Sequence, residues 1–329
     1  MSRNLTRRRF IETGTAIVAA MPCAGFARAQ AWPSKPIKII CAYPAGGITD
    51  LFARSYGDFV SEKVGQPVVV ENKTGAGGIL AAQAVKTAPA DGHTLLFAIT
   101  PTILQNRVLY KSLPYDTDKD FVLIACMPTG SLPLVAHKST GATNLKEFVQ
   151  YARSNKTSAG AFGAGSTAHI AATELNKAFG IQMTIAHYRG EAPMWQDLAA
   201  GAIQVGSGSY AGASSVLQSG AGRAIAVTQT KRMKKLPDVA TYLEQGLTSK
   251  AFQLKTYICV VGPAGMRLQI VERLSALFVE GGDSERVQRL LDTFGIDEGP
   301  LGHEDFKKLY ADEGPIWISL AKNLGLTPK

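Results

Sequence analysis

The sequence is poor in the residues that build metal centres and disulfide frameworks. Its 329 residues include four cysteines and five histidines, and neither Cys-x-x-Cys nor His-Glu-x-x-His spacing occurs. Zinc sites and redox motifs depend on such spacings. We therefore expect no metal and no redox centre. Cys41, Cys126 and Cys259 each lie in an apolar run and are expected to be buried thiols, although one disulfide among them stays open.

Signatures of common enzymes are also missing. No serine stands in a Gly-x-Ser-x-Gly elbow, and the glycine-rich run 75–80 has Leu80 where a dinucleotide-binding turn needs glycine or alanine. Asp116, Asp118 and Asp120 alternate, but the glycine and glutamate of a calcium-binding loop are absent. We therefore expect no catalytic residue and no cofactor, and predict that the protein is not an enzyme.

A strong charge of one sign is missing once the N-terminus is set apart. Residues 1–29 hold five arginines and one glutamate, which is +4 of the formal net charge of +9. The remaining charge, about +5 over 300 residues, is mild, and no lysine and arginine block is interleaved with aromatics. This composition argues against a nucleic-acid partner and weakly favours anionic ligands. The basic run 231–235 is expected to be a solvated loop.

The first 29 residues have the pattern of a cleavable export signal. A basic stretch with Arg7-Arg8-Arg9 precedes a short apolar segment, 15–21, and Ala27-Arg28-Ala29 supplies small residues for a signal peptidase. The arginine pair favours the twin-arginine route, and an ordinary secretory signal is the alternative. We expect cleavage near Ala29 and a periplasmic mature protein. No later apolar run reaches the length of about 20 residues that spans a membrane.

Strand-length apolar runs alternate with segments of helical period over residues 37–228. Such alternation predicts an α/β protein with two mainly parallel sheets flanked by helices. The C-terminal part, from 269 onward, is mostly of helical period. A helical tail suits a chain that leaves its first lobe, builds a second one and then returns.

The expected crossings between the lobes lie near 126–132 and 250–258. Residues 30–128 plus 255–329 would then form lobe 1, and 129–254 would form lobe 2.

Two glycine-containing loops precede predicted helices in different halves of the chain. Residues 43–49 read Tyr-Pro-Ala-Gly-Gly-Ile-Thr, and residues 163–169 read Gly-Ala-Gly-Ser-Thr-Ala-His. Glycine lets the backbone approach a ligand, and a helix N-terminus offers N–H groups to an anion. Either loop taken alone is equally consistent with a tight strand-to-helix turn. The pair predicts a cleft that closes on a carboxylate.

Weaker candidates follow two other predicted strands. Thr100 and Thr102 flank a proline at one strand end, and Arg189-Gly190-Glu191 precedes a third helix. An arginine can pair bidentately with a carboxylate, but a solvated surface pair of arginine and glutamate explains the residues equally well. Ser166 and His169 would share one helical turn. That spacing leaves an exported hydrolase or isomerase as an alternative, without an evident orienting carboxylate.

The ordered motifs of the whole mature chain resemble the tripartite tricarboxylate transporter receptors, the periplasmic substrate-binding proteins of the Bug family. The residues that carry the resemblance are 32–37, 44–50, 65–72, 75–78, 90–96, 113–116, 165–169, 236–239 and 262–265. The resemblance implies a type II periplasmic-binding-protein (Venus flytrap) fold with a ligand cleft between two lobes. It also implies capture of organic acids or their amide relatives by main-chain N–H groups, and delivery to tripartite membrane transporter subunits.

One stretch departs from the family. Where relatives carry a strand end like Val-Asp-Leu-Met-Phe-Asp-Asn, residues 203–210 read Ile-Gln-Val-Gly-Ser-Gly-Ser-Tyr. The loss of acidic residues could admit a more anionic or larger ligand, and Tyr210 could stack on an aromatic one. Mono-, di- and aromatic carboxylates therefore stay open, as does a sensor or scaffold protein with an altered pocket. We expect a monomer.

The sequence nominates ligand-binding residues from all of these loops. They are Tyr43, Pro44, Ala45, Gly46, Gly47, Thr49, Thr100, Thr102, Gly165, Ser166, Thr167, His169, Arg189, Gly190, Glu191, Ser209 and Tyr210.

Overall fold

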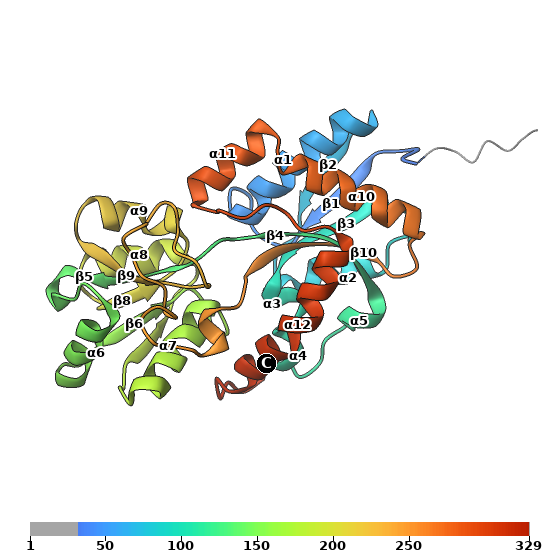
Figure 1. Cartoon of the computed structure of the whole chain (residues 1–329). Coiled ribbons are helices and arrows are strands. Elements are labelled where there is room, and N and C mark those ends of the chain that lie inside the picture. The colour runs from blue at the N-terminus through green and yellow to red at the C-terminus, as the bar shows by residue number, and fades with distance from the viewer. Residues whose placement is uncertain (1–31, 329) are drawn as a thin grey trace, which may run out of the picture.

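The computed structural model describes residues 32–328, which form two α/β lobes lying side by side (Figure 1). The expected export signal lies outside the described residues. Each lobe is built on one five-stranded sheet, with strand order β2-β1-β3-β10-β4 in the first lobe and β7-β6-β8-β5-β9 in the second. The predicted α/β class, with two sheets flanked by helices, is confirmed.

The strands and helices follow the sequence pattern closely. The first sheet consists of β1 (Ile37–Cys41), β2 (Val68–Asn72), β3 (Thr94–Ile99), β4 (Phe121–Pro128) and β10 (Tyr257–Pro263). The second sheet consists of β5 (Pro133–His137), β6 (Ser158–Ala161), β7 (Thr184–His187), β8 (Val205–Ser207) and β9 (Gly222–Val227). The helices of the first lobe are α1 (Ile48–Val64), α2 (Ile79–Lys86), α3 (Thr100–Ile103), α4 (Asn106–Leu109), α5 (Thr117–Asp120), α10 (Leu268–Gly281), α11 (Glu285–Phe294) and α12 (His303–Lys322). Those of the second lobe are α6 (Leu145–Ser154), α7 (Thr167–Phe179), α8 (Glu191–Ala199) and α9 (Tyr210–Gln218).

Each sheet is mixed, because one strand runs against the other four. β10 is antiparallel to both β3 and β4, and β5 is antiparallel to both β8 and β9. The pairs of β1 with β2 and β3, and of β6 with β7 and β8, are parallel. β5 and β10 are the first strands that the chain adds after it passes from one sheet to the other. The antiparallel direction of these two strands therefore arises where the chain crosses between the lobes, and the local periodicity of the sequence does not predict it.

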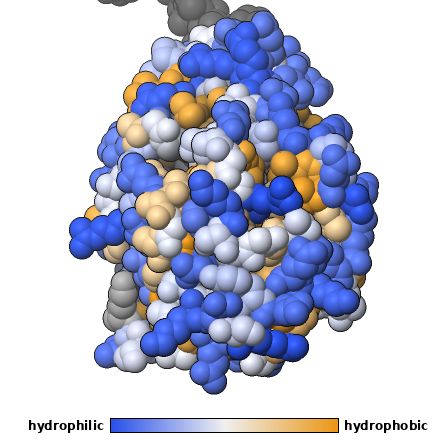
Figure 2. Space-filling view, turned by 90° about the vertical axis from the view of Figure 1, so that its left-hand side faces the viewer, coloured by the Kyte–Doolittle hydropathy of each residue, from blue (hydrophilic) through white to orange (hydrophobic). Residues whose placement is uncertain are grey.

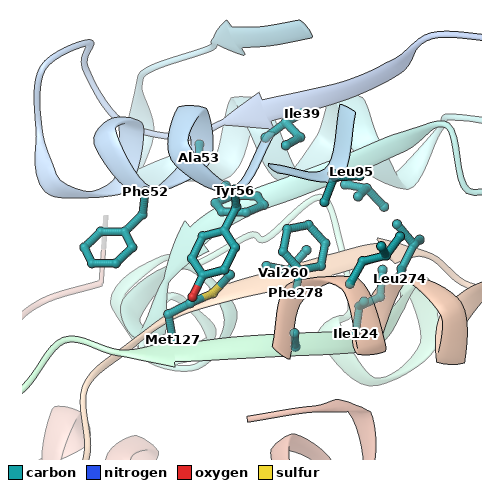
Figure 3. Close-up of a cluster of buried hydrophobic side chains, with 14 of the residues drawn as sticks. Ile39, Phe52, Ala53, Tyr56, Leu95, Ile124, Met127, Val260, Leu274 and Phe278 are labelled. Carbon is teal, nitrogen blue, oxygen red and sulfur yellow. The ribbon is translucent and has the colours of Figure 1, made fainter. Parts of the chain in front are cut away.

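Helix α1 shows how the first lobe's core positions a loop. Phe52, Tyr56 and Val60 recur every four residues and are buried, so one face of the helix packs against the sheet. In Figure 3 the Tyr56 ring faces Phe278 of α10, and their ring centroids lie 5.7 Å apart. Burial of each such side chain stabilises the fold by about 2–3 kcal/mol. This packing holds the N-terminus of α1 in place beside the end of β1.

The cysteines agree with the expectation of buried thiols. Cys41, Cys126 and Cys259 are free and buried. Cys126 and Cys259 are directly opposite each other in the register of β4 and β10. Burial raises the pKa of the Cys259 thiol to about 12. The disulfide that the sequence left open is therefore not formed in this structure.

The basic run 231–235 is a loop whose four basic residues are exposed, as expected, and two of them also contact the first lobe. Lys235 Nζ lies 2.6 Å from Asp292 Oδ1 of α11, and the Lys234 N–H donates to Asp297 Oδ2 at 2.9 Å. The run follows β9 of the second sheet, whereas both carboxylates belong to the first lobe. Lys234 and Lys235 of the second lobe thus contact carboxylates of the first lobe that are distant in the sequence.

The surface of the molecule is largely hydrophilic where Figure 2 shows it. That view looks onto the second lobe's end of the molecule, and its apolar areas are separated by polar ones. Among residues 32–328, no helix is both long and apolar enough to cross a membrane.

Candidate functional site

A cavity of about 1090 Å³ lies between the two lobes. The segments that follow β1 and β3 border this interlobe cavity from the first lobe, and those that follow β6, β7 and β8 border it from the second. All five are carboxyl ends of strands, where open α/β sheets bind their ligands. The volume is slightly above the range of roughly 300–1,000 Å³ that small-molecule sites occupy. Both position and size are those of a ligand site.

The loop between β1 and α1 presents backbone N–H groups to the cavity. Gly47 is the N-cap residue of α1 and offers no side chain to cap it, and Ile48 and Thr49 of the first turn line the cavity. The first N–H groups of a helix have no acceptor inside the helix. Gly46 has φ +80°, a conformation that only glycine adopts at little cost. The loop is therefore built to receive an anion on main-chain donors.

Asp50 holds this loop in position from below. Its buried carboxylate accepts hydrogen bonds from the Gly46 N–H at 2.9 Å, from Arg54 Nε at 3.1 Å and from Asn72 Nδ2 at 2.8 Å. Burial alone would raise the pKa of Asp50, but these donors together keep it below its ordinary value. Asp50, Arg54 and Asn72 are not among the predicted site residues. Asn72 is 22 residues from Asp50 and 18 from Arg54, so no local pattern joins it to this loop.

The loop between β6 and α7 repeats the arrangement in the second lobe. Gly165 has φ +77°, and Ser166 is the N-cap residue of α7, where its Oγ accepts from the His169 backbone N–H at 3.3 Å. Gly165, Ser166 and Thr167 all line the interlobe cavity. No acidic residue stands in the first turn of α7. Two helix N-termini, one from each lobe, thus face the same space.

His169 supports this second loop from behind. Its Nδ1 accepts a hydrogen bond from the Gly165 N–H at 3.1 Å, and its ring packs edge-on against His187 with centroids 4.5 Å apart. Burial, and then the neighbouring His187, lower the pKa of His169 to about 4. The neutral ring keeps Nδ1 as an acceptor. His169 therefore fixes the backbone of Gly165 and does not itself line the cavity.

A third junction places a carboxylate at the cavity. Glu191 is the first residue of α8, and its side chain reaches the N-terminus of α9. Oε1 accepts from the Ser209 N–H at 3.0 Å, and Oε2 accepts from Ser209 Oγ at 2.6 Å and from Trp195 Nε1 at 3.3 Å. The stretch that lost the acidic residues expected for the family therefore still has a carboxylate beside it, supplied by another helix.

The rest of the cavity wall is largely apolar. Nine of its residues were not predicted, because their segments have the pattern of ordinary core or loop. They are Ile99, Pro101, Leu109, Tyr110, Leu132, Phe162, Trp195, Phe294 and Leu326. Leu109 of α4 reaches across to the second lobe, where its Cδ1 lies 2.6 Å from the point that a Cβ on Gly165 would occupy. A Cβ at position 165 would therefore force Leu109 to shift, and the φ of +77° also favours glycine there.

Eleven of the predicted ligand residues line the interlobe cavity. They are Tyr43, Pro44, Gly46, Gly47, Thr49, Gly165, Ser166, Thr167, Gly190, Glu191 and Ser209. The structure places six others away from its wall. They are Ala45, Thr100, Thr102, His169, Arg189 and Tyr210.

The two threonines hold the backbone at strand ends. Thr100 Oγ1 donates to the Tyr257 carbonyl at 3.1 Å and accepts from the Tyr257 N–H at 2.9 Å, which ties β3 to β10. Thr102 Oγ1 donates to the Gly77 carbonyl at 3.1 Å and lies 3.0 Å from the Tyr43 hydroxyl. Both hydroxyls thus have structural partners.

Tyr210 and Arg189 point elsewhere. The Tyr210 Cβ lies 3.2 Å from the point that a Cβ on Gly295 would occupy, so its side chain packs on the segment after α11. Arg189 is exposed to solvent. Neither the stacking residue nor the cation that the sequence suggested therefore stands in the cavity wall.

The arrangement of Ser166 and His169 does not form a nucleophile and base pair. The Ser166 hydroxyl accepts from a backbone N–H as a helix cap, and His169 Nδ1 is already bonded to the Gly165 N–H. Activation of a serine needs a hydrogen bond from its hydroxyl to the base. Among residues 32–328, no three His, Cys, Asp or Glu side chains gather where they could hold a metal ion.

Comparisons with known proteins agree on one family. The profile described as "Tripartite tricarboxylate transporter family receptor" matches residues 52–326. A protein of Pseudomonas sp. (strain P51), described as "UPF0065 protein in tcbD-tcbE intergenic region", is 31% identical over 320 residues, which is 96% of this chain and 94% of the relative. Protein BugT of Bordetella pertussis is 26% identical over 94% of this chain and 95% of its own length.

Solved structures show the same fold. The R. palustris protein Rpa4515, determined with adipate, superimposes with a TM-score of 0.78 at 28% identity and covers 91% of this chain and 100% of its own. MatC from Rhodopseudomonas palustris, with bound malate, gives 0.71 at 28% identity over 88% and 99%. The periplasmic binding protein BugD gives 0.73 at 26% identity over 91% and 100%. The chain therefore belongs to the tripartite tricarboxylate transporter receptors, the Bug family of periplasmic binding proteins, and is a solute receptor rather than an enzyme.

Proposed function

We propose that this receptor captures a small organic carboxylate in the interlobe cavity. The observation that carries the proposal is the meeting of two helix N-termini, those of α1 and α7, at one cavity from different lobes. Main-chain N–H groups and the helix dipoles provide positive potential there. Closure of two lobes around a ligand is a known motion of such proteins.

The relatives support the same chemistry. The structure of Rpa4515 was determined with adipate and that of MatC with malate, and each of those proteins aligns over nearly its full length with this chain. Both compounds are carboxylates. We carry over to this chain the chemical class and not the compounds.

We further propose how the receptor is made and used. The chain is exported by the twin-arginine route, cleaved near Ala29, and released into the periplasm as a monomer, where it hands its ligand to the membrane subunits of a tripartite transporter. Residues 30–128 with 255–329 form lobe 1, and 129–254 form lobe 2. The separation of strands β1–β4 and β10 from β5–β9 supports these boundaries. Mass spectrometry of the exported protein tests the cleavage site, and a mature chain that starts far from Gln30 contradicts it.

A thermal-shift screen of the mature protein tests the function. A ligand that binds only the folded state raises the melting temperature, and the stabilisation grows with the logarithm of the ratio of its concentration to its Kd. The screen tests mono-, di-, tri- and aromatic carboxylates, and the control for each carboxylate is the corresponding alcohol or amide. At least one carboxylate should raise the melting temperature, and Ser166→Ala should reduce that rise. If no carboxylate has an effect, the function is wrong and a sensor or scaffold protein with an altered pocket is favoured.

A further inference from the structure

The interlobe cavity has a single charged side chain among the described residues that line it. Among the described residues that line it, Glu191 is the only acidic side chain, and no lysine, arginine or histidine is present. The only charged side chain among these lining residues is therefore negative, and an anion in the cavity meets neutral donors, which are backbone N–H groups and side chains such as Asn106 and Gln196. Most of the remaining wall is apolar, with Leu132, Phe162 and Trp195 among its larger side chains.

The Glu191 carboxylate is held in place by neutral donors alone. These are the Ser209 N–H, the Ser209 hydroxyl and the Trp195 indole N–H. The ion pairs among residues 32–328 do not include Glu191, whereas Asp50, the acidic residue in the first turn of α1, is paired with Arg54 at 3.0 Å. Glu191 thus differs from Asp50 in leaving its charge uncompensated beside the cavity.

Two glycines make room for this carboxylate. A Cβ at Gly208 would lie 3.0 Å from Glu191 Cδ, and a Cβ at Gly212 would lie 2.3 Å from Glu191 Oε2 and 2.7 Å from Trp195 Nε1. Any larger residue at position 212 would displace the carboxylate or the indole. The glycines of the unusual 203–210 stretch and of α9 therefore belong to one arrangement with Glu191 and Trp195.

Glu191 also changes what the nearby helix ends can bind. Its charge stands in the first turn of α8, and its oxygens accept from the N-cap residue of α9. A carboxylate at a helix N-terminus satisfies the same donors and dipole that would attract an anionic ligand. The first turn of α7 has no acidic residue, and the Asp50 carboxylate in the first turn of α1 is compensated by Arg54, so both N-termini can still attract an anionic ligand. The N-termini of α8 and α9 instead have the unpaired carboxylate of Glu191 beside them.

We propose that the ligand carries one carboxylate, bound at the α1 and α7 N-termini, and an amine or other N–H donor that faces Glu191 across an apolar body. This inference rests on the proposed function and narrows its ligand class. A second carboxylate at that end would meet the uncompensated charge of Glu191, since like charges at close range repel. A protonated amine would pair with it. The loss of acidic residues in 203–210 suggested a more anionic ligand. With Glu191 beside the cavity, we instead propose a ligand with fewer negative charges.

Ligands of equal length test the proposal. Hexanoate, 6-aminohexanoate and adipate share a six-carbon chain and differ only at one end, and 4-(aminomethyl)benzoate and terephthalate form a rigid pair. Calorimetry with the mature protein should show the amino acid of each pair binding at least about tenfold more tightly than the dicarboxylate, with hexanoate between the two in the first series. Equal or tighter binding of the dicarboxylates by the natural protein overturns the inference.

Glu191→Gln separates charge from shape. The amide keeps the size of the side chain and loses its charge, so the preference for the amino acid over the dicarboxylate should fall by about tenfold. Glu285→Gln is the matched control, since Glu285 is the first residue of α11, is exposed and does not line the cavity. The Glu285→Gln variant should prefer the amino acid over the dicarboxylate by the same factor as the natural protein. An unchanged ratio in Glu191→Gln also overturns the inference.

Two further measurements distinguish failure of this inference from failure of the proposed function. If Glu191→Gln fails to fold, Glu191→Asp, which keeps the charge but shortens its reach, should retain part of the preference, and an inverted preference there contradicts the assignment. If the amino acids and the dicarboxylates, together with the wider set of carboxylates in the thermal-shift screen, all fail to bind, it is the proposed function that is overturned.

Discussion

His169 and Gly165 are joined by a hydrogen bond in which the backbone N–H of the glycine donates to the imidazole Nδ1 across 3.1 Å. The bond lies directly beneath the loop that presents Ser166 to the cavity, and the imidazole is buried. An imidazole therefore supports a main-chain anion site instead of acting on the ligand.

Replacement of His169 by alanine should weaken both the fold and the binding of carboxylates. The Gly165 N–H would lose its acceptor in a buried position, which costs about 1–3 kcal/mol, and the loop would lose its fixed geometry. The expected result is a lower free energy of unfolding in urea and a roughly tenfold higher Kd in calorimetry. Lys177→Ala serves as the control, since Lys177 lies on the same helix, is exposed and does not line the cavity. Equal effects of both variants on Kd would contradict a specific role of His169.

The stability of the protein should fall as the pH decreases from about 6.5 to about 4. Burial lowers the pKa of His169 to about 4, below the value of about 6.5 that an unfolded chain has. Between these values the unfolded state binds more protons, so acid favours unfolding. The loss attributable to His169 is on the order of 3 kcal/mol. Urea unfolding at several pH values measures it, and a slope equally steep in His169→Ala would show that another group is responsible.

Gly46 and Gly47 should respond differently to alanine. Gly46 has φ +80°, where a Cβ meets no neighbouring atom but the backbone conformation itself is unfavourable, so Gly46→Ala should destabilise the protein by about 1–2 kcal/mol. Gly47 has φ −76°, which alanine adopts freely, and its replacement should cost about 0.5 kcal/mol. Thermal unfolding compares the two. An equal loss of stability in both variants would mean that steric space, and not backbone conformation, determines the need for glycine in this loop.

The ion pair of Lys235 with Asp292 should contribute little to stability but should depend on salt. The side chains are 35% and 74% exposed, and such pairs contribute at most about 1 kcal/mol. A double-mutant cycle with Lys235→Ala and Asp292→Asn should give a coupling energy in this range at low ionic strength, and salt near 1 M should abolish most of it. A coupling of several kcal/mol that salt leaves unchanged would show that the contact between the lobes is far better shielded than its exposure indicates.

Local patterns predicted the parts of the site that local physics decides. The loops 43–49 and 163–169 join a strand to a helix within a few residues, so glycine, a capping serine and the helix start are readable in order along the chain. The same reasoning predicted a helix after the glycines of the loop 43–49, and α1 begins at Ile48. It did not predict the short helices α3, α4 and α5, where four residues are too few for a period to register.

The sequence by itself determined the alternation of strands and helices, the two glycine loops and the family pattern, because each depends on residues close together in the chain. Tertiary structure alone decided which of the candidate side chains reach the cavity. It turned Thr100 toward Tyr257 and Tyr210 toward Gly295, and it brought Glu191 to Ser209, 18 residues away. Such contacts depend on the order of strands in each sheet and on the crossings between lobes, which no spacing along the chain records.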